Sequence, residues 1–475
     1  MTRNEIKERE IEFLAKEHKK NPLLFERDTL LDDAPFLERI GVFIPNQKNF
    51  PVGYLRLWPQ DFIVEEILQN GDVQSIAVED FLDKKMGGVN GNPTIYATLV
   101  KCGLSTIEAI DEIASFLDID KKKIQFAGIK DKNAITSQLI SIRESNYEKI
   151  QKISSPYLFL KNVYSGKGVV EMGGLTGNCF TILVRANKFF NEKEFLDNLE
   201  KKEKDGFFNF FYQQRFGTPR LINWFWGLLI LRGEYEKAVL SFISSPGLRE
   251  ISYFKNIRNE IKKIWGNWEK IEQILSPFPL ILQNELRVIS HLREKPDDFT
   301  GALNKIPEQV RLWIFAYASL LFNRKLSDCL KKGVKPPDTM PLIPSKNRAD
   351  WLFYKNFLEE NKIFSLPLDN LKPFSFIQWE GRTINTKEGV AISQAKIIKE
   401  GVILSFALPK ACYATTFLSQ LFQLAWGLPP QNISSLPVDT KATLGQNSLE
   451  EILNKFSKVI HPKTENVFEK FLQNE

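Results

Sequence analysis

The sequence has few residues of the types that build disulfide frameworks and metal sites. Its four cysteines are scattered, with neither a disulfide-framework spacing nor a CxxC pair, and they are Cys102, Cys179, Cys329 and Cys412. Its only histidines are His18, His291 and His461. A metal site built from histidine and cysteine is therefore not expected.

Long apolar runs are also missing. No stretch approaches the roughly 18 consecutive apolar residues of a membrane helix. The first ten residues are mostly charged and lack an apolar core, so we expect no signal peptide and predict a cytoplasmic protein. We also expect a monomer. The 475 residues, 43% of them hydrophobic, are enough for roughly two to four globular domains. A net charge of +6 permits nucleic-acid binding without requiring it.

The most informative stretch is residues 124–142. A short apolar run at 124–127 predicts a buried strand, and Gly128 permits a sharp turn because it has no Cβ atom. Residues 135–142 alternate between apolar and polar types, which predicts a half-buried strand. Asp131 is thus expected between Lys130 and Lys132 on a loop held by two strands.

Local chemistry leaves two interpretations of Asp131 open. Asp and Asn are common in solvated turns because their side chains bond to nearby backbone groups. The alternative is a catalytic carboxylate, since neighbouring cations favour the ionised form that a nucleophile or general base requires.

The order of residues in this loop carries a resemblance. The run Phe126-Ala-Gly-Ile-Lys-Asp-Lys-Asn-Ala-Ile-Thr-Ser-Gln138 is similar to the signature of the TruD family of tRNA pseudouridine synthases. In that family the pattern is an aromatic residue, Ala-Gly-x-Lys-Asp, a basic residue and x-Ala-(Val/Ile)-Thr-x-Gln. The family's catalytic aspartate falls on Asp131.

Two earlier segments also resemble the family. Arg56 stands five positions before Asp61-Phe-Ile-Val-Glu-Glu66, which matches a basic residue ahead of Asp-Phe-x-Val-x-Glu. The family usually has Lys there, near the active site, and Arg keeps the charge but changes the donor geometry. Lys101 matches a family lysine at the end of a strand. It is interpreted either as surface charge or as an RNA contact.

A third segment, residues 206–217, combines five phenylalanines with Asn209, Gln214 and Arg215. Aromatic runs of this kind are commonly core strands, but buried polar side chains need partners. A pocket for an everted base needs both an aromatic face and polar groups. The run resembles Pro-Asn-Tyr-Phe-Gly-x-Gln-Arg-Phe-Gly of the family, which places its active-site Asn on Asn209 and its base-stacking Phe on Phe211.

The match is not complete. Besides Arg56, the departures include Phe208, Tyr212 and Ala411, where the family usually has Pro, Gly and Gly, and Ser419-Gln420, where it usually has Arg-Glu. The helical periodicity of residues 310–326 and the strand ending at Pro409 also resemble family segments. In total the resemblance extends over about residues 52–425.

The resemblance implies an α+β pseudouridine synthase catalytic domain with a mixed antiparallel sheet, interrupted by an inserted TRUD domain, with a cleft between the two. The expected division is a helical extension at 1–48, the first catalytic part at 49–222, the TRUD domain at 223–385, and the return to the catalytic domain with a helical tail at 386–475.

The implied function is isomerisation of uridine to pseudouridine in tRNA, the family's site being position 13. This reaction has no redox or phosphoryl-transfer step, so the resemblance implies neither a metal ion nor an organic cofactor. Asp131 is expected to be catalytic, as nucleophile or as base, and to line one cavity with Phe211. The expected substrate-binding residues are Asn209, Phe211, Arg56, Lys101, Lys130, Gln214 and Arg215. Two alternatives stay open: a tRNA-binding or tRNA-folding module without activity, and a nucleoside hydrolase or glycosylase that uses the same carboxylate.

Overall fold

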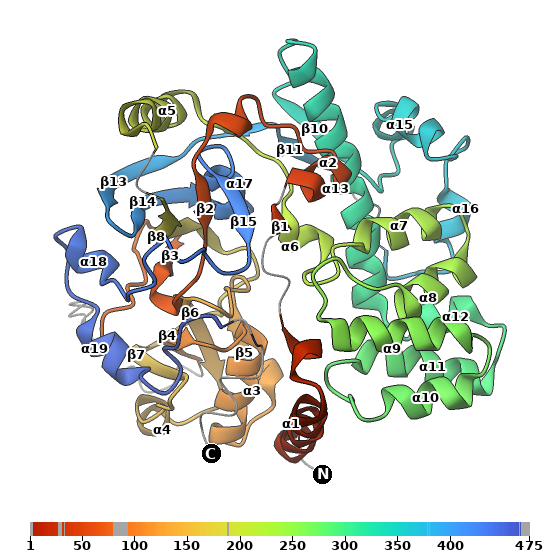
Figure 1. Cartoon of the computed structure of the whole chain (residues 1–475). Coiled ribbons are helices and arrows are strands. Elements are labelled where there is room, and N and C mark those ends of the chain that lie inside the picture. Colours follow the sequence, from red (N-terminus) through yellow and green to blue (C-terminus); the bar gives the residue numbers. More distant parts are fainter. Residues whose placement is uncertain are drawn as a thin grey trace. The chain divides into compact units, whose positions relative to one another are not determined.

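The structure is a computed structural model, and it describes residues 3–26, 31–32, 34–78, 94–187, 190–377, 379, 381–464 and 466. The chain divides into two compact units. We call residues 46–207 and 388–463 the sheet unit, and residues 1–45, 208–387 and 464–475 the helical unit. Figure 1 labels helices and strands of each unit.

The sheet unit is built on a mixed sheet. Its strands are β2 (Val52–Tyr54), β3 (Phe62–Leu68), β4 (Thr94–Cys102), β5 (Ile124–Phe126), β6 (Ile135–Arg143), β7 (Leu158–Gly166), β8 (Leu175–Ala186), β13 (Ala391–Ile398), β14 (Gly401–Pro409) and β15 (Gln423–Trp426). The order β13-β14-β8-β3-β6-β4-β7 runs across it. Among the pairs that these ten strands form with one another in the described residues, β3–β6 and β2–β15 are parallel and the others are antiparallel. The expected mixed α+β architecture is thus confirmed.

Two strand pairings bring distant parts of the sequence together. β14 pairs with β8 from Gly401 opposite Arg185 to Pro409 opposite Gly177, so the C-terminal part of the chain joins the same sheet as the N-terminal part. Along one edge of β6, its first residues (135–137) pair with β3 and its later residues (140–142) pair with β5. The loop between β5 and β6, which carries Asp131, therefore lies next to the start of β3.

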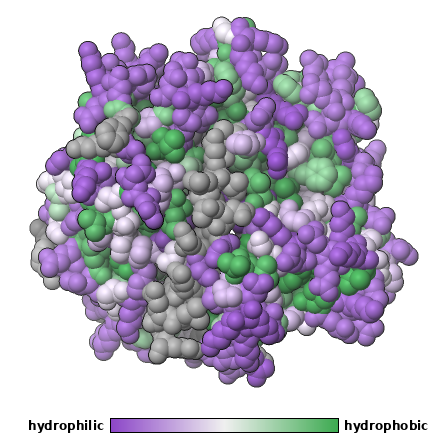
Figure 2. Space-filling view, in the orientation of Figure 1, coloured by the Kyte–Doolittle hydropathy of each residue, from purple (hydrophilic) through white to green (hydrophobic). Residues whose placement is uncertain are grey.

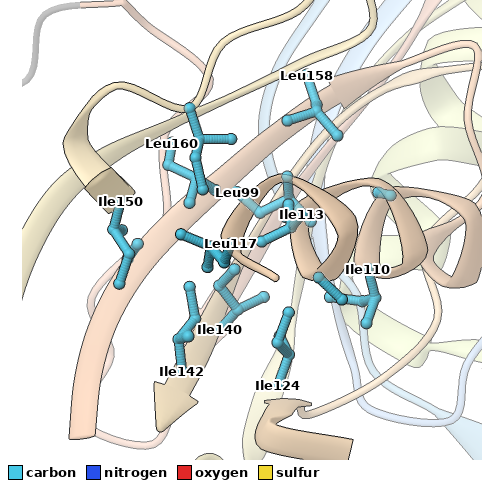
Figure 3. Close-up of a cluster of buried hydrophobic side chains, with 14 of the residues drawn as sticks. Leu99, Ile110, Ile113, Leu117, Ile124, Ile140, Ile142, Ile150, Leu158 and Leu160 are labelled. Carbon is cyan, nitrogen blue, oxygen red and sulfur yellow. The ribbon is translucent and has the colours of Figure 1, made fainter. Parts of the chain in front are cut away.

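Both faces of the sheet are covered. On one face, α3 (Thr106–Leu117) packs its apolar side chains against β4, β5, β6 and β7, as Figure 3 shows for Ile110, Ile113 and Leu117. On the other, the segment around α19 (Glu450–Lys455) covers residues of β3, β4 and β6. The remaining helices of this unit are α4 (Tyr147–Gln151), α5 (Glu192–Asp205), α17 (Ala414–Leu418) and α18 (Thr440–Thr443).

Because both faces of the sheet are covered, the expectation for β6 is wrong. β6 is not half-buried as its alternating sequence predicts, because Thr136, Ser137 and Gln138 are as completely buried as Ile135 and Ile140. Two of the polar members are accommodated by hydrogen bonds: the Ser137 hydroxyl donates to the carbonyl of Gln74, and the Gln138 amide donates to the carbonyl of Gly128.

The helical unit contains a series of helices between residues 223 and 385. They are α7 (Asn223–Leu231), α8 (Tyr235–Ser244), α9 (Ser252–Lys263), α10 (Trp268–Leu275), α11 (Gln283–Glu294), α12 (Phe299–Asn304), α13 (Pro307–Lys331), α14 (Arg348–Leu352), α15 (Lys355–Glu360) and α16 (Leu368–Leu371). The unit also holds α1 (Arg3–Lys20), α2 (Ala34–Arg39), α6 (Gln213–Phe216) and the hairpin of β10 (Thr339–Leu342) and β11 (Arg382–Asn385).

The longest helix, α13, forms the core of this unit. Its residues Trp313, Tyr317 and Phe322 are completely buried, and it packs closely on α7. The approach requires a glycine, since a Cβ atom at Gly227 would overlap the carbonyl oxygen of Trp313.

Hydrophilic residues cover most of the face drawn in Figure 2, with hydrophobic residues scattered among them. Among the described residues, no helix has the length and apolar character needed to span a bilayer. The same residues include no group of three or more His, Cys, Asp or Glu side chains arranged to hold a metal ion.

Candidate active site

Asp131 lies on the loop between β5 and β6, where the sequence predicts it. Its side chain keeps 35% of its surface exposed, whereas Lys130 and Ala134 on either side are buried. The two strands fix the ends of the loop, with Phe126 opposite Ile140 in the antiparallel ladder. The loop thus presents a single carboxylate to solvent from a rigid base.

One cation contacts this carboxylate directly. Nη2 of Arg56 lies 2.8 Å from Oδ1 of Asp131, although 75 positions separate the two residues. The guanidinium also stacks over the ring of Phe62, 4.1 Å from its centroid. Arg56 has a left-handed backbone (φ 60°), which is unfavourable for a residue with a Cβ atom. Strain of this kind is commonly found at functional sites.

The segment that carries Arg56 is anchored by a buried ion pair. Asp61 and Arg185 are fully buried, and the guanidinium meets the carboxylate through two hydrogen bonds of 2.9 and 2.8 Å. Asp61 also accepts a hydrogen bond from the backbone N–H of Trp58. Burial raises the pKa of Asp61, and the Arg185 guanidinium acts against that shift.

Lys101 lies beneath the Asp131 loop. The residue is fully buried at the end of β4, and its ammonium donates to the carbonyl oxygens of Asp131 (2.7 Å) and Leu104 (2.8 Å). Burial lowers the pKa of Lys101 to about 8, although the charge of Asp131 acts in the opposite direction. Lys101 therefore holds the backbone at Asp131.

Lys130 also points into the protein. Its Nζ lies 2.7 Å from Oε1 of Glu66, which is completely buried, and donates to Oδ1 of Asn178 at 2.8 Å. The backbone N–H of Lys130 donates to Oγ1 of Thr106 at the start of α3. Lys130, although next to Asp131 in sequence, thus forms its ion pair with Glu66.

The pattern Ser105-Thr-Ile-Glu108 predicts a capping box at the start of α3, and the structure confirms it. Ser105 and Glu108 exchange hydrogen bonds between side chain and backbone, and both carboxylate oxygens of Glu108 accept from Lys132. Burial alone would raise the pKa of Glu108, but the hydrogen bonds from Ser105 and the Lys132 ammonium lower it to about 2. Glu108 therefore remains a charged partner for Lys132.

Four of the expected substrate-binding residues belong to the helical unit. Asn209 is mostly buried, and its side-chain amide donates to the carbonyl of Asn385 at 3.2 Å. The guanidinium of Arg215 lies over the ring of Phe211, 5.3 Å from its centroid. Gln214 is exposed in α6. Within the helical unit, Arg215 and Phe211 are therefore in contact with each other.

Phe211 is held by a residue that the sequence did not single out. The side chain of Asn323 in α13 accepts from the backbone N–H of Phe211 and donates to its carbonyl, both at 2.9 Å. The ring of Phe211 meets that of Phe322 edge to face, with centroids 5.3 Å apart. A two-point clamp of this kind fixes the backbone that carries the aromatic ring.

Comparison with known proteins assigns the chain to a family. The family model of tRNA pseudouridine synthase D (TruD) matches residues 46–341, which is more than half of the chain. The chain belongs to the TruD family. It is therefore a member of a family of isomerases, and the resemblance seen in its motifs is confirmed.

Individual TruD proteins match most of the chain. A tRNA pseudouridine synthase D of Aquifex aeolicus is 33% identical over 400 residues, which cover 77% of this chain and 96% of the relative. A probable tRNA pseudouridine synthase D of Methanococcoides burtonii is 31% identical over 455 residues, with 83% and 99% coverage. A crystal structure of a Methanosarcina mazei protein assigned as TruD superimposes with a TM-score of 0.60 at 25% identity, covering 81% of this chain and 97% of that one.

The backbone at Ala411 explains why glycine is favoured at this position of the TruD pattern. Ala411 has a left-handed backbone (φ 67°), a conformation that glycine adopts without strain. The glycine that the family usually has at this position is thus the residue that the turn favours. The backbone keeps the turn in this chain despite the added Cβ atom.

Glu66, Asn178 and Asn323 contact expected site residues, yet the sequence assigns them no role. All three lie inside segments that resemble family motifs, Glu66 in residues 61–66, Asn178 in residues 175–185 and Asn323 in residues 310–326, and this resemblance is the signal that could have drawn attention to them. Nothing local in the sequence indicates that Asn323 bonds to Phe211, 112 positions away.

Proposed function

We propose that this chain isomerises uridine to pseudouridine in tRNA, at position 13, with Asp131 as the catalytic carboxylate. The observation that carries the proposal is the half-exposed carboxylate of Asp131, held by Arg56 and by a loop whose backbone is fixed from below by Lys101. Membership of the TruD family supports the choice of substrate and reaction.

The reaction needs a group close to the sugar of the target nucleotide. The bond between C1′ and N1 breaks, the uracil turns, and C5 bonds to C1′; C5 loses a proton and N1 gains one. Asp131 acts either as the nucleophile at C1′ or as the base in an elimination route. The contact with Arg56 orients the carboxylate for either role.

The base must also leave its stack, which costs a few kcal/mol. We propose that Phe211 stacks on the uracil and that Asn209, Gln214 and Arg215 contact the substrate. A planar aromatic ring stacks on any base, and a polar side chain beside it can read an edge of that base. The clamp from Asn323 to the backbone of Phe211 supports this assignment, because it fixes the ring's point of attachment.

For Lys101 and Lys130 we propose a positioning role in place of the direct substrate contact predicted from the sequence. Both ammonium groups are buried and bonded to protein groups. An ammonium that already donates to buried carbonyls would have to break those bonds to reach a phosphate. Arg56, by contrast, contacts the carboxylate of Asp131 directly.

The test is Asp131→Asn, assayed by release of tritium from tRNA labelled at C5 of uridine. We expect the single-turnover rate to fall by at least about 10³-fold, as when a nucleophile is removed, while tRNA binding persists. Asp197→Asn, a matched change of an exposed carboxylate on α5, is the control and should retain full activity.

Three outcomes would contradict the proposal. Wild-type rates in Asp131→Asn would remove that residue from the chemistry. Binding of tRNA by the intact protein without any pseudouridine would favour a binding module. Free uracil in the reaction mixture would indicate hydrolysis of the glycosidic bond.

A further inference from the structure

An apolar side chain projects from the Asp131 loop. Ile129 keeps 70% of its surface exposed, whereas Ala127 keeps 3% and Lys130 keeps 6%. Isolated exposed isoleucines are common on protein surfaces. The location of Ile129 is what distinguishes it, because it lies two residues from Asp131, so their Cα atoms are at most about 7 Å apart.

The loop holds Ile129 in this orientation. The side-chain amide of Gln138 donates to the carbonyl of Gly128 at 3.0 Å, and the backbone N–H of Lys130 donates to Thr106 at 2.9 Å. The residues on both sides of Ile129 are thus bonded to β6 and α3. The side chain extends from a fixed point and not from a mobile tip.

A second turn lies beside this one and adds positive charge. The N–H of Gly173 donates to the carbonyl of Ala127 at 2.7 Å, and the exposed Lys410 donates to the carbonyl of Gly173 at 3.2 Å. Met172, in the same turn, is 73% exposed. An apolar surface bordered by a cation suits a nucleotide, whose base is flat and apolar on its faces and whose phosphate is anionic.

We propose that Ile129 inserts into the space that the target uridine leaves when it turns out of its stack, and contacts the neighbouring base. This inference rests on the proposed function. Stacked nucleotides follow one another at about 3.4 Å along a strand, so removing one base opens a gap of roughly 7 Å. Apolar side chains fill such gaps in other nucleic-acid complexes and offset the lost stacking. Ile129 is thus a positioning residue that stabilises the everted state.

The experiment compares Ile129→Ala and Ile129→Leu with wild type on tRNA carrying 2-aminopurine next to the target uridine. Its fluorescence rises when the neighbouring base leaves the stack. We expect Ile129→Ala to lower the single-turnover kcat/KM about tenfold and to abolish most of the fluorescence rise, because the gap is no longer filled. Ile129→Leu, which keeps the apolar volume, should restore both signals.

The control is Leu196→Ala on α5, where an aliphatic side chain that is 46% exposed is truncated in the same way. It should leave both signals unchanged. Fluorescence and rate in Ile129→Ala that equal those of wild type would overturn the inference. So would a slower rate with an unchanged fluorescence rise, since eversion would then not depend on this side chain.

The proposed function is judged separately. Loss of activity in Asp131→Asn together with a normal Ile129→Ala variant would leave the proposed function standing and refute the role of Ile129 alone. Activity that survives in Asp131→Asn would refute the proposed function, whatever Ile129→Ala does.

Discussion

Replacing Lys101 by methionine tests the arrangement of the Asp131 loop most directly. Methionine is also unbranched and flexible, so it can fill the same buried space without donating hydrogen bonds. The change removes the donors to the carbonyls of Asp131 and Leu104, at 2.7 and 2.8 Å. It leaves Asp131, Arg56 and their contact chemically intact.

The expected effect on stability is modest because two contributions oppose each other. Two buried carbonyls lose their donor, which costs about 1–3 kcal/mol each. The variant also no longer buries a charge. The pKa of Lys101, about 8 against an ordinary value of 10.5, places the penalty for burying that charge at about 3 kcal/mol. We expect a net loss of about 1–2 kcal/mol in the free energy of unfolding.

The expected effect on catalysis is larger. Without the ammonium, the backbone at Asp131 is free to move, and a displacement of about 1 Å can lower a rate about 100-fold. We therefore expect kcat to fall about 100-fold while the Kd for tRNA stays near its wild-type value. Single-turnover kinetics and filter binding measure the two quantities separately.

The pH dependence gives the same variant a second readout. Below about pH 8 Lys101 is protonated in the folded and the unfolded states. Between about 8 and 10.5 the folded state loses this proton first, so the unfolded state binds more protons and stability rises with pH. The stability of wild type relative to Lys101→Met should therefore increase across this window, as measured by urea unfolding.

Lys132→Met is the matched control. Lys132 stands in the same loop, but its side chain is half exposed and pairs with Glu108 at the surface. Its loss should cost at most about 1 kcal/mol and leave kcat unchanged. If a stably folded Lys101→Met variant has the kcat of wild type, the hydrogen bond from Lys101 to the carbonyl of Asp131 is not needed for catalysis, and the positioning role of Lys101 is refuted.

Two further predictions concern stability. Asp61→Asn leaves the guanidinium of Arg185 buried without its anion, so we expect a loss of about 3–5 kcal/mol in urea unfolding; a loss below about 1 kcal/mol would contradict the buried pair. Ala411→Gly relieves a left-handed backbone, and despite the greater freedom of glycine in the unfolded state we expect a gain of up to about 1 kcal/mol. A lower melting temperature in Ala411→Gly would show that this turn is not strained.

Local features of the fold could be read from the sequence with good accuracy. The strand, turn and strand around Asp131, the capping box at Ser105 and a helix over residues 310–326 all form where the pattern places them. Each depends on neighbours within a few residues, so propensity and periodicity are sufficient. The half-buried character expected of β6 was wrong because burial depends on what covers each face of the sheet.

The sequence by itself also determined the family, through ordered motifs, and the residue type at each site position. Only the tertiary structure decided which partner each charge takes. Lys101, Lys130 and Lys132 look alike in sequence, yet one holds backbone carbonyls, one meets a buried glutamate and one reaches a surface carboxylate. The reason is physical. The residue type determines the charge, but the partner of that charge depends on which strands, distant in sequence, lie side by side in the sheet. A buried charge without a partner would destabilise the fold, so each buried lysine is paired or hydrogen-bonded.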